Sequence, residues 1–106
     1  MEGMELICFQ IIAASGGAKS AFIAAIDAAK QGDFEEAANQ MAAGEEYMNQ
    51  RHEPHAQMIQ KEAAGEPNPI SLLLIHAEDQ MMGAEQFKVL AQETIDLYKT
   101  LADLKK

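Results

Sequence analysis

The stretch QGDFEEA, residues 31–37, contains the signals that end one helix and begin another. Gly32 suits the residue after a helix C-terminus, because glycine adopts a positive φ without a Cβ clash. Asp33 is a good N-cap, and Glu35 and Glu36 fall in the first turn of the next helix, where the helix dipole favours negative charge. The stretch therefore predicts two helices joined by a very short turn, which makes them antiparallel neighbours.

Helical periodicity extends from this turn in both directions. Apolar positions recur at helical spacing from Glu5 to Lys30, and Gly16-Gly17 within this segment predicts a local weakening or bend. The following helix is predicted over residues 33–64. Pro54 lies inside it, removes one backbone hydrogen bond and crowds the preceding turn, so we expect a kink or break near residues 50–54.

The stretch AAGEPNPIS, residues 63–71, ends the second helix with a glycine and two prolines. A third helix is predicted from Pro69, since proline is tolerated in a first turn, to about residue 105. Its apolar stripe comprises Leu72, Leu73, Ile75, Met82, Phe87, Leu90, Ile95, Leu97, Tyr98, Leu101 and Leu104. No alternating strand pattern competes. We therefore expect one all-α domain, residues 1–106, folded as an antiparallel three-helix bundle with helices at about 4–31, 33–64 and 69–105.

Composition narrows the classes of partner. The 106 residues carry a net charge of −9, which disfavours nucleic acid and anionic membrane surfaces as partners. No apolar run approaches the roughly 20 residues of a membrane-spanning helix, and the first residues lack a basic region, so we expect a cytoplasmic protein without membrane insertion. The single cysteine, Cys8, lies among apolar residues and is expected to be a small buried thiol.

The stretch SLLLIHAEDQMMG, residues 71–83, places ionisable groups inside the most apolar helical segment. Residues 72–75 are apolar around most of the helix circumference, which indicates burial on all sides. Three thin helices cannot provide that cover, so we expect other copies of the chain to do so, in a homo-oligomer. His76, Asp79 and Gln80 have spacings of three and four and therefore share one helix face.

These residue types allow two chemistries and one structural alternative. Histidine can act as a neutral nucleophile near pH 7 and carry a phosphoryl group. Asp79, repeated around a symmetry axis, would gather carboxylates that bind a hard divalent cation such as Mg²⁺. In the alternative, His76 and Asp79 only satisfy an interface of a non-catalytic helical interaction or regulatory module. A histidine phosphotransfer domain of two-component signalling fits less well, because it normally has lysine and glycine after the histidine, where this chain has Glu78 to Gln80.

Other ionisable residues have simpler explanations. Glu78 is expected to be a solvated charge. His52 and His55 flank Pro54 and could resemble a metal pair, but no third ligand follows at a suitable spacing, so we expect surface residues.

Four stretches of this chain resemble one protein family. Residues 9–20 are similar to the family pattern GFEIVAxAGDARS, residues 28–37 to AAQxGDFEEA, residues 58–65 to LIQKEAxG, and residues 71–82 to SLLLVHAQDHLM. The family is the enzyme IIA component of the lactose/cellobiose/chitobiose class of the bacterial phosphoenolpyruvate-dependent sugar phosphotransferase system. This chain departs from it at Gln80, where the family has a second histidine, and at Glu78, where the family has glutamine.

The resemblance implies a homotrimer of three-helix bundles, nine helices in all, with active sites at subunit boundaries. His76 matches the histidine that accepts a phosphoryl group on Nε2 from phosphorylated HPr and passes it to a cysteine of the IIB component, which phosphorylates a disaccharide during import. Asp79 matches the aspartate that three subunits bring together around a metal ion. Gln80 and Glu78 are expected to be active-site neighbours.

Overall fold

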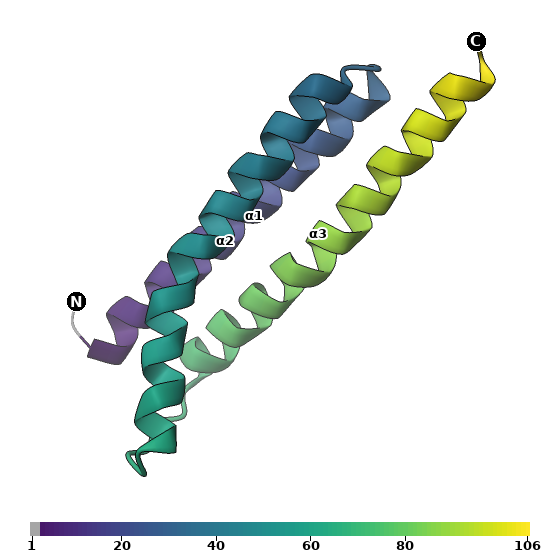
Figure 1. The fold of residues 1–106 in the computed structure, drawn as a ribbon. Helices are drawn as coiled ribbons and strands as arrows, with labels where there is room; N and C mark the ends of the chain where they lie inside the picture. Colours follow the sequence, from purple (N-terminus) through teal and green to yellow (C-terminus); the bar gives the residue numbers. More distant parts are fainter. Residues whose placement is uncertain (1–2) are drawn as a thin grey trace.

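The computed structural model describes residues 3–106 as three helices: α1 (Gly3–Lys30), α2 (Phe34–Ala63) and α3 (Leu72–Leu104). They run up, down and up in an elongated bundle with extents of 59 × 23 × 20 Å (Figure 1). No strand occurs among the described residues. The all-α, antiparallel three-helix bundle is confirmed. α1 packs along both of its neighbours, whereas α2 and α3 contact each other much less.

The turn between α1 and α2 forms as its residues predict. Gly32 has a φ of +80°, its N–H donates to the carbonyl of Ala29 at 3.0 Å, and the N–H of Asp33 donates to the carbonyl of Ala28 at 2.9 Å. These two bonds satisfy carbonyls that the end of a helix would otherwise leave free. The Asp33 carboxylate then accepts from the N–H of Glu36 at 3.1 Å. Gly32 as the C-terminal glycine and Asp33 as the N-cap are both confirmed.

The connection between α2 and α3 differs from its prediction at one end. Gly65, with a φ of +85°, closes α2 in the same way as Gly32 closes α1. α3, however, begins at Leu72 and not at Pro69. The Ser71 hydroxyl accepts from the N–H of Leu74 at 3.1 Å, so this side chain provides the N-cap and sets the helix start.

Two predicted weak points lie inside continuous helices. α1 passes through Gly16-Gly17 without interruption, and α2 continues through Pro54. Of the two outcomes expected near residues 50–54, a kink or a break, the break is therefore wrong. Arg51 and Met58 are buried on either side of Pro54, and this packing holds the helix together across the missing hydrogen bond. α2 does change direction along its length, as Figure 1 shows.

The core consists of three clusters of buried residues along α1. Small side chains dominate it, so the helix backbones can approach closely. The first cluster contains Cys8, Ile11, Met58, Ala77 and Met81. The second contains Ala18, Phe22, Ala84 and Ala91, and the third Ala25, Ala29, Ala37 and Ile95. The prediction that Cys8 is a buried thiol is confirmed.

α3 has two apolar faces, and only one of them meets the core. The inner face contributes the buried residues Ala77, Met81, Ala84, Ala91 and Ile95. Most of the predicted stripe instead lies on the outside: Leu72, Ile75, Met82, Leu90, Leu97, Leu101 and Leu104 are exposed. We call these seven residues the outer face of α3.

The prediction that no apolar run approaches a membrane-spanning length is wrong for α1. By length and composition it is apolar enough to cross a membrane, with a mean hydropathy of 1.5 over its most apolar window. The same helix supplies nine buried residues and packs against both α2 and α3. Its central place in the bundle accounts for its hydropathy.

Candidate functional site

The candidate site lies in the first turns of α3, just after its N-cap. His76 and Asp79 are both exposed in the single chain. They lie on the same side as Ile75 and Leu72, whose exposed fractions are 56% and 82%. An exposed imidazole and an exposed carboxylate are thus surrounded by apolar side chains that the chain itself leaves uncovered.

Gln80 and Glu78, unlike this exposed pair, bond to side chains of the two neighbouring helices. The Lys19 ammonium on α1 donates to the Gln80 amide oxygen at 3.1 Å. Glu78 faces α2, where its carboxylate lies 2.8 Å from Nε2 of His55. Within one chain, therefore, the four predicted site residues divide into an exposed pair and two residues bound to other helices.

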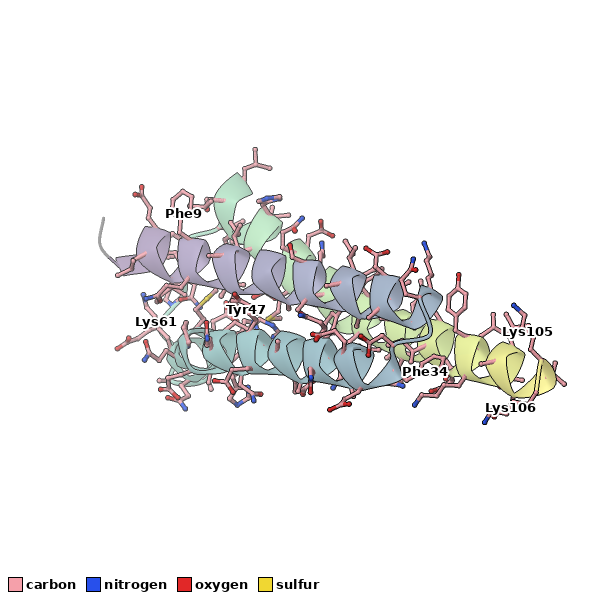
Figure 2. All side chains as sticks on the ribbon, turned by 90° about the horizontal axis from the view of Figure 1, so that it is seen from above. Phe9, Phe34, Tyr47, Lys61, Lys105 and Lys106 are labelled. Atoms are coloured by element: carbon pink, nitrogen blue, oxygen red, sulfur yellow. The ribbon has the colours of Figure 1, made fainter. Side chains whose placement is uncertain are left out.

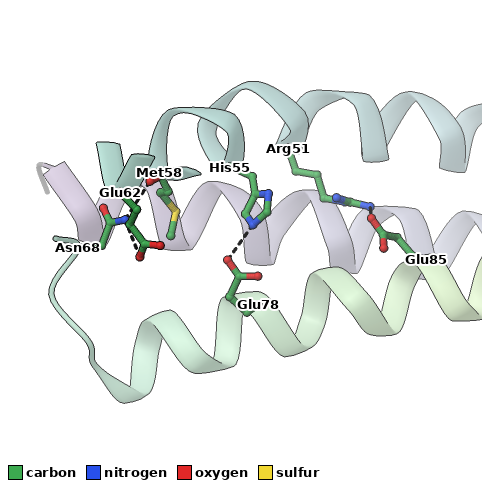
Figure 3. A network of polar contacts seen from close by, with 7 residues as sticks. All are labelled: Arg51, His55, Met58, Glu62, Asn68, Glu78 and Glu85. Carbon is green, nitrogen blue, oxygen red and sulfur yellow. Dashed lines mark hydrogen bonds and ion pairs between the residues drawn. The ribbon is translucent and has the colours of Figure 1, made fainter. Parts of the chain in front are cut away.

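Glu78 belongs to one of three polar side-chain pairs that connect α2 and α3. Its partner is His55; Arg51 pairs with Glu85 at 3.0 Å, and Glu45 pairs with Lys88. Figure 3 shows the first two of these pairs crossing from one helix to the other. The side chain of Arg51 is only 7% exposed, so its partner matters for the balance of buried charge. α2 and α3 have few close backbone contacts, and these polar pairs add to the apolar packing that joins the two helices.

Asn68 lies in the connection between α2 and α3 and bonds to α2. Its amide nitrogen donates to the carbonyl of Met58 at 3.0 Å and to the carboxylate of Glu62 at 3.2 Å (Figure 3). A shallow cavity of about 240 Å³ lies between these residues and Glu78. These bonds attach the segment just before α3 to α2 and so help to position the start of α3, which carries His76.

The Glu78 carboxylate also acts on the thiol beneath it. Burial raises the pKa of Cys8 above its ordinary value of 9.0, and the negative charge of Glu78 raises it further. Cys8 consequently stays protonated at neutral pH and is a poor nucleophile. The imidazole of His76 is thus the better nucleophile of the two at this end of the bundle.

The described residues of a single chain do not form a metal centre by themselves. Among residues 3–106, no group of three or more His, Cys, Asp or Glu side chains converges in a way that could hold an ion. Asp79 provides one carboxylate on an exposed face, so a site built on it needs carboxylates from other copies.

Sequence reasoning missed Lys19, Arg51 and the role of His55. Each acts through a contact between different helices, and helical periodicity alone does not give the register between helices. His55, which was expected to be a surface residue, is instead partly buried against Glu78.

Comparisons with known proteins agree with this architecture. The profile of the family described as "PTS system, Lactose/Cellobiose specific IIA subunit" matches residues 6–99. The oligo-beta-mannoside-specific EIIA component of Bacillus subtilis (strain 168) is 45% identical over 96 residues, covering 91% of this chain and 87% of that protein.

Solved structures show the same helix arrangement. The cellobiose-specific enzyme IIA from Bacillus anthracis superposes with a TM-score of 0.92 at 44% identity, covering 97% of this chain and 95% of that one. The chitobiose IIA protein, solved in solution as a complex with HPr from the Escherichia coli phosphotransferase system, has a TM-score of 0.82 at 31% identity. That alignment covers 96% of this chain and 99% of the other.

Proposed function

This chain belongs to the lactose/cellobiose-specific IIA subunit family of the phosphotransferase system, and we propose that it carries the phosphoryl group on His76. Members of this family are phosphocarrier components of sugar phosphotransferases. The observation that carries the assignment is the exposed imidazole of His76 in the first turns of α3. An incoming protein can reach this imidazole without any movement of the bundle.

The chemistry requires only a neutral imidazole and correct positioning. The electron pair on Nε2 of His76 forms the P–N bond while the bond from phosphorus to the donor breaks, and the donor keeps that electron pair. In the second transfer a thiolate attacks phosphorus and Nε2 keeps the electron pair of the P–N bond. Phosphoryl transfer of this kind depends mainly on positioning and on electrostatic stabilisation. Asn68 and Ser71 supply the positioning, because they fix the start of α3.

HPr is the proposed donor, and a IIB component is the proposed acceptor. The related chitobiose IIA protein was solved in complex with HPr. The end of the bundle that carries His76 also exposes Phe9 on α1, which is labelled in Figure 2. An apolar side chain of this kind lets a partner dock and exclude water from the transferred group. The sugar is a β-linked disaccharide of the lactose, cellobiose or chitobiose type, and the location is the cytoplasm.

We further propose that three copies assemble through the outer face of α3. Its seven exposed apolar residues extend from Leu72 to Leu104 at coiled-coil spacings, and a monomer would leave them all in water. Asp79 interrupts this face between Ile75 and Met82. In a trimer the three Asp79 carboxylates meet near the axis, where their hard oxygen donors suit a divalent cation such as Mg²⁺, which would neutralise their repulsion.

Phosphorylation of the purified chain tests the assignment. Phosphoenolpyruvate, enzyme I and HPr should label it in an acid-labile form, and His76→Ala should abolish the labelling. The matched control is His52→Ala, an exposed histidine on α2, which should be labelled like the wild type. If the wild type takes up no phosphate, or if His76→Ala is still labelled, the phosphocarrier assignment fails and a non-catalytic helical module becomes the better description.

A further inference from the structure

We propose that Lys19 is a phosphoryl-binding residue, whose ammonium group, held in place by Gln80, supplies the positive charge beside a phosphoryl group on His76. The inference rests on the phosphocarrier function proposed above and adds a residue from α1 to the site. The 3.1 Å hydrogen bond from Lys19 to the Gln80 amide oxygen is its starting point.

Helix geometry places this contact next to His76. Gln80 follows His76 by four residues, so the two side chains are neighbours on the surface of α3, with Cβ atoms about 5–6 Å apart. Side chains on a helix also lean towards its N-terminus, so the Gln80 amide leans towards His76 and not away from it. Because Gln80 is one helix turn from His76, the flexible Lys19 side chain can move its ammonium towards a phosphoryl group on the imidazole while it stays near Gln80.

Gly83 leaves the space that the lysine occupies. A Cβ atom at position 83 would lie 3.4 Å from Nζ and 3.6 Å from Cε of Lys19. The end of the lysine therefore passes over bare helix backbone, and a longer side chain at position 83 would displace it. Gln80 and Gly83 of α3 therefore accommodate the ammonium group of Lys19 from α1.

The ammonium of Lys19 bonds to an uncharged group, whereas the nearby cations pair with carboxylates and the other nearby charges are negative. Its hydrogen-bond partner in the described chain is a neutral amide, while Arg51 and Lys88 pair with carboxylates. Glu78 is turned to His55, and Asp79 brings negative charge to the His76 face. A phosphoryl group adds a charge of about −1.5 to −2, so it needs a nearby cation.

Lys19 can respond without losing its support. An ammonium has three donors, so it can keep the bond to Gln80 and donate to a phosphoryl oxygen as well. A charge-assisted bond to phosphate is about twice as strong as a bond to a neutral amide. Gln80 therefore serves as a positioning residue for Lys19.

Transfer from phosphorylated HPr to Lys19→Gln measures this effect. We expect the equilibrium level of phosphorylated protein to fall about three- to tenfold, the range for one ion pair at a partly exposed site. The difference from the wild type should shrink in about 1 M salt, where the Debye length is about 3 Å. Lys19→Arg should restore most of the transfer, because it keeps the charge. The matched control Lys30→Gln removes a charge from the same helix beside Asp27 and should change nothing.

Two further variants separate charge placement from folding. Gly83→Met, which favours helix formation, should displace the ammonium and lower phosphorylation although Lys19 is intact. Gln80→Leu combined with Lys19→Gln should lose less than the sum of the single losses, since both act on one cation. Thermal unfolding and light scattering would verify that each variant keeps its fold and its mass.

The outcomes distinguish this inference from the proposed function. A wild type that takes up no phosphate overturns the phosphocarrier assignment itself. A wild type that is labelled, together with Lys19→Gln and Gly83→Met variants within twofold of it at low salt, overturns the role of Lys19 alone.

Discussion

Three glycines in helix interiors, Gly16, Gly17 and Gly44, allow packing to be measured separately from helix propensity. An alanine replaces glycine in a helix interior with a gain of about 1 kcal/mol, wherever the position lies. What differs is the space for the added Cβ atom. At Gly16 nothing lies within 4 Å of it, so the full gain should appear as increased stability.

At Gly44 the Cβ atom added by alanine would contact a core residue. The new Cβ would lie 2.6 Å from Cδ1 and 2.8 Å from Cζ of Phe22, a ring that is completely buried. Overpacking of this kind costs about 1–3 kcal/mol, and Phe22 has no open side to move into. Subtracting the propensity gain leaves Gly44→Ala less stable by up to about 2 kcal/mol.

Gly17 provides the intermediate case. Its added Cβ would lie 2.6 Å from two carbons of the Tyr47 ring, which extends from α2 towards α1 (Figure 2). Tyr47 is 41% exposed, so its ring can swing outward at the loss of some contact. We expect the two effects to cancel to within about 0.5 kcal/mol.

Thermal unfolding followed by far-UV circular dichroism would rank the stabilities of the three alanine variants. For a domain of this size 1 kcal/mol shifts Tm by roughly 4 °C. The Tm of Gly16→Ala should therefore rise by about that amount, whereas the Tm of Gly44→Ala should fall by up to about 8 °C. All variants must be compared at one protein concentration, because assembly stabilises the folded chain by mass action. If Gly44→Ala rises as much as Gly16→Ala, the core around Phe22 yields freely and the packing argument is wrong.

Three other predictions concern charge. Glu85→Ala leaves the buried guanidinium of Arg51 without its partner and should lower the free energy of unfolding, measured in urea, by about 1–2 kcal/mol. This value is smaller than for a fully buried pair because Glu85 is half-exposed. The exposed control Glu93→Ala should show little change. The raised pKa of Cys8 means that the unfolded chain loses its thiol proton first, so stability should fall as pH rises past 9.0, and Cys8→Ala should remove that dependence in unfolding measurements on either side of 9.0. Asp79→Leu should keep the trimer in light scattering. In the presence of a chelator it should be more stable than the wild type by about 1 kcal/mol or more, because it lacks the carboxylate repulsion that the cation otherwise neutralises. The chelator should lower the Tm of the wild type alone, and equal chelator effects on both proteins would contradict the cation site.

The fold could be read from the sequence because its signals are local. Gly32 and Asp33 define the first turn through bonds to residues only a few positions away, and the helical period of α1 does not depend on what it packs against. The errors arose where a local signal met competition. Ser71 provided a better N-cap than the turn at Pro69 predicted, and packing on both sides of Pro54 kept α2 continuous.

The site could be predicted only in part, for the same reason. His76 and Asp79 stand out in the sequence because they interrupt an apolar helix at spacings of three and four, which is information held within one helix. The partners of Gln80 and Glu78 come from α1 and α2, and nothing in the sequence fixes the register between helices.

The sequence by itself determined three helices, the two turns that join them and the residue chemistry on α3, since capping and periodicity act over a few residues. Only the tertiary structure decided that α3 leaves one apolar face in water, that Glu78 pairs with His55, and that the amine of Lys19 donates to Gln80. These depend on the rotation and register of packed helices, which are set by the fit of side chains distant in sequence.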